Sequence, residues 1–224
     1  TIMLKLDQDQ INQKIDFIEN YVSASNAATG SQFDANANVS SKNIATLESE
    51  LNKDINIQVN RSLMSKRLSE LFDDEIANEY LRQIKKHEIY VHDETSLKPY
   101  CVSISMYPFL LRGLETLGGE SGAPRHLESF AGSFVNLVFA ISSQFAGAVA
   151  TVEFLMYLDY FARKDFGEDY LVEHKREFEG VLKHVVYSIN QPAAARGYQA
   201  VFWNISLYDE NYFNSMFESF VFPD

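Results

Sequence analysis

The first third of the chain repeats hydrophobic and polar positions with the period of an amphipathic helix. Apolar side chains recur every three or four residues over 7–22, and the same spacing resumes over 44–84, with charged side chains between them. Residues 23–41 interrupt the pattern with small and polar side chains, so they are predicted to form a loop. We therefore expect a helical N-terminal region over residues 1–87.

After residue 88 the pattern changes to short runs typical of β-strands. Residues 89–92 are β-prone, and residues 100–105 alternate between a larger apolar set and a smaller polar set that contains the only cysteine. A further strand is predicted over 199–206. Long helical connections between strands imply parallel pairing, so we expect an α/β fold over residues 88–224.

The uncharged stretch 130–152 is long enough to cross a bilayer, which takes about 20 apolar residues. Asn136 and Gln144 argue against a membrane span, because unpaired polar groups in hydrocarbon are costly. The stretch is instead predicted to form one or two buried helices in a protein interior or a subunit interface. Residues 154–161 are expected to continue this helical region.

Three further features complete the predicted layout. Residues 118–124 are rich in glycine and form a turn; they resemble a phosphate loop only superficially, because they lack the lysine and carry Glu120. Helices are predicted over 171–186 and over 208–220, the latter opening at Asp209. Three strands do not complete a sheet, so we expect the chain to be a segment of a larger enzyme.

Composition narrows the classes of partner and compartment. The chain has 31 acidic and 19 basic side chains and a formal charge of -12, which disfavours general binding to nucleic acid. Hydrophobic residues make up 46% of the chain, enough for a sizeable core. One cysteine cannot form an internal disulfide, so a reducing cytoplasm is expected.

Cys101 is the first candidate for chemistry. It is expected on the polar face of the predicted strand, where it is either an inert packed thiol or a reactive one. His92, followed by Asp93, lies a short distance upstream and would be its basic partner if the fold brings them together. The alternative is that the His–Asp pair caps a turn. No cluster of histidine and cysteine indicates a metal site.

Two polar clusters are candidates for ligand binding. Asn36 and Asn38 precede a predicted helix, where their amides either cap the helix or hold a polar ligand. Arg196 and Gln199 flank a glycine before a predicted strand, a suitable place to bind phosphate or a base. An ordinary solvated loop arginine explains the second cluster equally well.

Four segments occur in the order found in one known family. They are Asp-Ala-Asn-Ala-Asn-Val at 34–39, Tyr-Val-His-Asp at 90–93 with Pro-Tyr-Cys at 99–101, Ser-Ser-Gln-Phe-Ala-Gly at 142–147 and Ala-Arg-Gly-Tyr-Gln-Ala-Val-Phe at 195–202. Together they resemble the large chain of anaerobic, class III ribonucleotide reductase. The resemblance covers the chain from about residue 31 to its end.

The resemblance implies a fold and a reaction. The fold would be a helical N-terminal region followed by the first part of a ten-stranded α/β barrel of the glycyl-radical type, incomplete in this chain. The reaction would convert ribonucleoside triphosphates to deoxyribonucleoside triphosphates for DNA synthesis. The glycyl radical, placed by an iron–sulfur activase that uses S-adenosylmethionine, and a zinc site would lie outside this chain. The reductant would be formate or a thiol.

The resemblance also implies roles for individual residues. Cys101 would be the catalytic thiol beside the substrate ribose. Substrate-binding residues would be His92, Asn36, Asn38, Arg196 and Gln199. The helices over 130–161 would form a homodimer interface and a site for ATP or deoxynucleotide effectors, near Ser143, Gln144 and Gly147. Two other hypotheses stay open: a glycyl-radical enzyme of the pyruvate formate-lyase type, and a non-catalytic helical interaction module.

Overall fold

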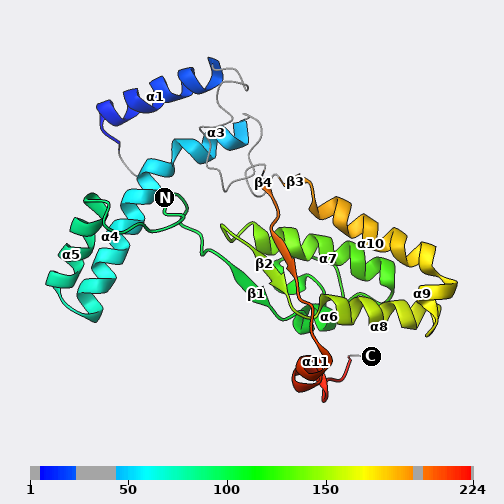
Figure 1. Ribbon diagram of the computed structural model, residues 1–224. Helices are drawn as coiled ribbons and strands as arrows, with labels where there is room; N and C mark the ends of the chain where they lie inside the picture. Colours follow the sequence, from blue (N-terminus) through cyan, green and yellow to red (C-terminus); the bar gives the residue numbers. More distant parts are fainter. Residues whose placement is uncertain (1–5, 24–43, 194–198, 223–224) are drawn as a thin grey trace. The chain divides into compact units, whose positions relative to one another are not determined.

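The structure is a computed structural model that describes residues 6–23, 44–193 and 199–222. The chain divides into two compact units, of which the first comprises residues 1–98 with 197–199 and the second residues 99–196 with 200–224 (Figure 1). The boundary that the sequence predicts after residue 87 stays a prediction. Each unit is built differently, the first from helices and the second from helices on a sheet.

The described part of the first unit is helical, as predicted. Its helices are α1 (Gln8–Ser23), α3 (Ile44–Leu51), α4 (Lys53–Leu71) and α5 (Asp74–Lys85). Helix α5 begins where the Asp73 carboxylate accepts a hydrogen bond of 2.8 Å from the backbone N–H of Ile76. This N-cap satisfies one of the free amides at the helix start and fixes the turn after α4.

Residues 89–92 do not form the predicted strand. The chain here runs into a turn that is held against α4 by side chains instead of by a strand partner. Asn60 donates hydrogen bonds to the backbone carbonyls of Glu94 at 2.7 Å and Ser96 at 2.8 Å. Arg61 also forms an ion pair of 2.8 Å with the Glu94 carboxylate. These contacts hold the segment that follows residues 89–92 in a turn, so β-propensity alone does not produce a strand here.

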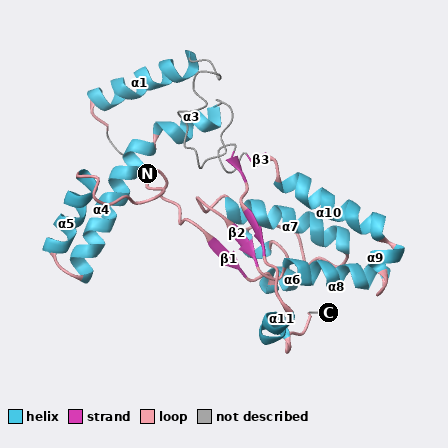
Figure 2. Cartoon of the chain, viewed as in Figure 1, coloured by secondary structure: helices cyan, strands magenta, loops and turns pink. Residues whose placement is uncertain are grey.

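A three-stranded parallel sheet organises the second unit. Its strands are β1 (Val102–Ile104), β2 (Val149–Thr151) and β5 (Trp203–Ile205), in the order β1-β2-β5 (Figure 2). Val149 of β2 pairs with Val102 on one side and Trp203 on the other. Two short strands, β3 (Pro192–Ala193) and β4 (Gln199–Ala200), form a separate sheet. The α/β class and the parallel pairing predicted from the sequence are confirmed.

The helices of this unit include those predicted from the sequence and two short ones before residue 118 that were not predicted. They are α6 (Tyr107–Arg112), the short 3-10 helix η1 (Glu115–Leu117), α7 (Leu127–Ser142), α8 (Phe154–Phe166), α9 (Tyr170–Glu173), α10 (Lys175–Ile189) and α11 (Glu210–Phe217). The glycine-rich segment after η1 is a turn, and Asp209 caps α11 by accepting a bond of 2.8 Å from the N–H of Tyr212. Both details agree with the sequence-based predictions.

The apolar stretch 130–152 departs from its prediction at one end. Helix α7 occupies it up to Ser142, but Val149–Thr151 is the central strand β2 and not helix. Within the described ranges, no helix is both long and apolar enough to span a membrane.

The core of the second unit is aromatic and lies between the helices and one face of the sheet. Phe130, Phe134 and Phe154 are fully buried and their rings contact one another, with ring centroids 4.4 Å apart for Phe134 and Phe154. Trp203 of β5 lies against Phe154 at 4.7 Å. Because aromatic side chains each bury a large area, this cluster anchors α7 and α8 to the strands.

Candidate active site

The two faces of the β1-β2-β5 sheet differ in chemistry. Along β1, Val102 and Ile104 are partly buried toward the core, whereas Cys101 and Ser103 are exposed. The alternation predicted for residues 100–105 is therefore present, with the cysteine on the polar side. Because paired residues of parallel strands point to the same face, Ser103 shares this face with Ala150 of β2 and Asn204 of β5. We call the face with Cys101, Ser103, Ala150 and Asn204 the open face.

Cys101 lies immediately before β1 and its side chain is exposed. The backbone N–H of Ala148 donates a hydrogen bond of 3.2 Å to its sulfur. The same segment pairs with the chain around the cysteine, since the carbonyl of Tyr100 accepts from the N–H of Gly147 at 2.5 Å and Val102 donates to the carbonyl of Ala148 at 2.9 Å. The thiol is thus held by the backbone that leads into β2 and is not packed as an inert core group.

Gly147 allows this close approach. A Cβ at this position would lie 2.7 Å from the Cys101 sulfur and 2.9 Å from the Tyr100 carbonyl oxygen. Contacts this short do not occur with real side chains, so residue 147 must be glycine for the two segments to pair as they do. The family resemblance implies a place for Gly147 in a dimer or effector region, and the sequence did not predict its contact with the thiol.

Glu153 ties the ends of β1 and β2 together. Its carboxylate accepts hydrogen bonds from the Ser105 hydroxyl at 3.0 Å and from the Met106 N–H at 3.2 Å, and the residue is buried. Nearby Tyr157 is also buried, and burial, followed by the negative charge of Glu153, raises the pKa of its phenol well above the usual range. The phenol therefore stays neutral, and the carboxylate fixes the turn from β1 into α6.

The predicted substrate-binding residues lie in the first unit or outside the described residues. His92 is exposed in the first unit, where its Nδ1 contacts the carboxylate of Asp93, so its proximity to Cys101 stays a prediction. Asn36, Asn38 and Arg196 lie outside the described residues, and Gln199 begins β4.

Ser143 and Gln144 follow directly after α7. The Ser143 hydroxyl donates to the carbonyl of Ala140 at 2.7 Å, in the last turn of the helix. The predicted role of this region in dimer formation and effector binding stays a prediction. The large apolar side chains of α7 and α8, including Phe130 and Phe154, are buried within the chain's own core. A partner would contact only the residues that this core leaves exposed.

Asn204 is a candidate that sequence reasoning missed. It is exposed on β5, between Trp203, which points into the core, and Ile205. A polar amide inside a short strand of large apolar residues was the available signal, because such a residue has to face away from the core. With Ser103 and Cys101 it gives the open face an amide, a hydroxyl and a thiol.

These groups define what the open face can do chemically. Amide and hydroxyl groups donate and accept hydrogen bonds to the hydroxyls of a polyol or a sugar, and the thiol carries a transferable hydrogen. Among the residues with described positions, no group of three or more His, Cys, Asp or Glu side chains is placed to hold a metal ion.

Comparison with solved structures shows where this fold occurs. The chain is similar to an anaerobic ribonucleotide reductase over 96% of its length, with 29% identity and a TM-score of 0.77. It is also similar to the anaerobic ribonucleotide reductase from Thermotoga maritima, both with glycerol in the active site (26% identity, TM-score 0.76, 96% of this chain) and with citrate there (22% identity, TM-score 0.75, 100% of this chain). The fold is therefore that of part of an anaerobic ribonucleotide reductase.

The family model for anaerobic ribonucleoside-triphosphate reductase matches residues 49–220. The chain belongs to this family of oxidoreductases, and the resemblance seen in the sequence is confirmed. The comparisons favour neither an enzyme of the pyruvate formate-lyase type nor an interaction module. A search of curated proteins finds no match. The chain covers only 34%, 34% and 43% of the three solved chains described above, so it corresponds to a part of such an enzyme.

Proposed function

We propose that this chain supplies the substrate-facing thiol of an enzyme that reduces ribonucleoside triphosphates to deoxyribonucleoside triphosphates. The observation that carries the proposal is the position of Cys101, exposed on the polar face of a parallel sheet and fixed by the Ala148 N–H. Membership of the anaerobic ribonucleoside-triphosphate reductase family supports the reaction.

Each group of the open face has a task in this proposal. The S–H bond of Cys101 is weaker than an O–H bond, so the thiol can give a hydrogen atom to a carbon-centred radical and keep the unpaired electron on sulfur. Ser103 and Asn204 would hold ribose hydroxyls by hydrogen bonds. The Ala148 amide occupies one acceptor direction of the sulfur, which leaves the thiol hydrogen to point elsewhere.

Other components would come from outside this chain. The radical would reside on a glycine in another part of the protein, installed by an iron–sulfur activase that uses S-adenosylmethionine, with formate or a thiol as the reductant. His92, Asn36, Asn38, Arg196 and Gln199 would contribute to substrate binding. One solved relative, the Thermotoga maritima reductase, is described in complex with dATP and CTP, which supports nucleotide effectors for this protein too. We further propose a cytoplasmic homodimer.

The test replaces the thiol in the full-length protein that contains this chain. Deoxyribonucleotide formation is measured without oxygen after activation, and nucleotide affinity is measured on the same preparations. Cys101→Ser and Cys101→Ala are both expected to lower turnover by roughly a thousandfold or more, since neither side chain can give up a hydrogen atom easily. Nucleotide affinity and folding should be retained. Full turnover by either variant would reject the assigned role.

A further inference from the structure

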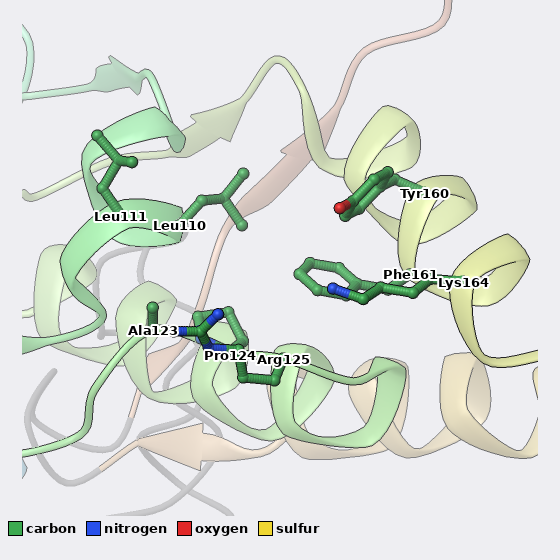
Figure 3. Close-up of a pocket in the computed structure, with 8 residues that line it drawn as sticks. All are labelled: Leu110, Leu111, Ala123, Pro124, Arg125, Tyr160, Phe161 and Lys164. Carbon is green, nitrogen blue, oxygen red and sulfur yellow. The ribbon is translucent and has the colours of Figure 1, made fainter. Parts of the chain in front are cut away.

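A small pocket in the second unit lies among α6, the segment that precedes α7, and α8. None of its lining residues belongs to the open face. Leu110, Pro124 and Phe161 form its apolar walls, and Arg125, Tyr160 and Lys164 supply its polar groups (Figure 3). Its volume is about 60 Å³. The pocket therefore combines a hydrophobic floor with two cations.

Arg125 and Lys164, the two cations of this pocket, differ from Arg163 in their ion pairing. In the described part of the chain, no carboxylate forms an ion pair with Arg125 or Lys164, whereas Arg163 pairs with Asp159 and Glu168. The Lys164 ammonium lies 5.7 Å from the centroid of the Tyr160 ring, on the pocket side of α8 (Figure 3). Two such cations lining one small pocket are unexpected in a chain with a formal charge of -12.

The acidic group that neighbours the pocket in sequence is already engaged. Asp165 follows Lys164 directly, but its carboxylate accepts a hydrogen bond of 2.7 Å from the N–H of Leu127 and contacts Nδ1 of His126 at 2.9 Å. It caps the first turn of α7 in this way. Asp165 therefore does not neutralise the positive charge of Arg125 and Lys164.

We propose that this pocket binds a compact oxyanion of phosphate size. Arg125 and Lys164 would supply charge-assisted hydrogen bonds and the Tyr160 hydroxyl a neutral one. A volume of about 60 Å³ has room for about four or five water molecules, close to the five heavy atoms of a phosphate group. A phosphoryl group fits this volume, either as free phosphate or as the end of a phosphate ester.

Binding is measured on the chain by calorimetric titration with inorganic phosphate and, separately, with glycerol phosphate, at constant ionic strength set by chloride. Both ligands are expected to give saturable binding, and the tighter one identifies the natural source of the phosphoryl group. Arg125→Gln and Lys164→Gln should each weaken binding by about tenfold or more, because each removes a charge-assisted bond. Tyr160→Phe should weaken it less and keep the ring.

Arg112→Gln is the matched control. Arg112 is an exposed cation of α6 that does not line the pocket, and the described part of the chain gives it no ion pair. The Arg112→Gln variant should bind phosphate as the wild type does, and all variants should keep the wild-type circular dichroism spectrum. An equal loss in Arg112→Gln would mean that only net charge matters. That result would overturn the proposal. So would wild-type affinity in the two pocket variants, or no saturation with either ligand.

Discussion

The two faces of the β1-β2-β5 sheet differ in what determines their residue types. On the core face, Val149 and Thr151 are fully buried and Trp203 packs against Phe154. On the open face, Cys101, Ser103 and Asn204 are exposed, and the only hydrogen bond described for the Cys101 sulfur comes from the Ala148 backbone. Burial and packing therefore account for the residue types on the first face. They do not account for a thiol and an amide on the second.

The difference between the two faces indicates which residues of this fold are candidates for function. A residue type that folding energetics requires gives no information about chemistry, whereas an exposed polar group on a strand has to be explained by a ligand or by solvent. The comparison predicts that substitutions on the core face change the free energy of unfolding, and that substitutions on the open face change turnover. Three variants test it in order of expected effect on stability.

The largest effect is expected for Phe154→Ala. Phe154 is fully buried against Phe134 and Trp203, so its truncation leaves a cavity and removes their ring contacts. The free energy of unfolding of the chain, measured by urea denaturation, should fall by about 3–5 kcal/mol. The matched control is Leu207→Ala, since Leu207 is 83% exposed and should cost less than about 0.5 kcal/mol. Similar losses in both variants would contradict the assigned core.

Gly147→Ala should lower the free energy of unfolding by about 1–3 kcal/mol, because the new methyl group overlaps the Cys101 sulfur and the Tyr100 carbonyl. It should also change the rate at which iodoacetamide alkylates Cys101, measured by mass spectrometry of the peptide that contains it. Gly180→Ala in α10 is the control, since a Cβ there meets nothing within 4 Å. That variant should gain up to about 1 kcal/mol from helix propensity and alkylate at the wild-type rate. The same sign of stability change in both variants would refute the steric argument.

Thr151→Val should lower the free energy of unfolding by a smaller amount, about 1 kcal/mol. The substitution keeps the shape of a buried side chain but removes the hydroxyl that accepts a hydrogen bond of 2.8 Å from Nε1 of Trp203. A double-mutant cycle with Trp203→Phe isolates this bond, because the two losses should not add once the bond is gone. Fully additive losses in urea denaturation would show that the bond contributes nothing to stability.

Much of the helical structure was predictable because the signals are local. The three-to-four spacing of apolar residues predicts α1, α4 and α5, and Asp209 marks the start of α11 through its side-chain cap. The alternation over residues 100–105 likewise predicts that Cys101 and Ser103 share one face of β1, as they do. Each of these patterns depends on residues close together in the sequence.

The errors share a physical cause, which is that strands depend on distant partners. Strand β2 is a three-residue element inside an uncharged run whose composition also suits a buried helix, and it becomes a strand by pairing with β1 and β5. Residues 89–92 have strand propensity, but Asn60 and Arg61 of α4 hold the segment that follows them in a turn. The contact of Gly147 with Cys101 also arises only when the parallel pairing forms.

Asn204→Ala in the full-length protein tests the division between the two faces most directly. Deoxyribonucleotide formation and the free energy of unfolding are measured on the same preparation. Because Asn204 is exposed and lies on the face of Cys101, its loss should lower turnover by roughly tenfold or more while unfolding changes by less than about 0.5 kcal/mol. Full turnover, with or without a loss of stability, would contradict the assignment of the open face to catalysis.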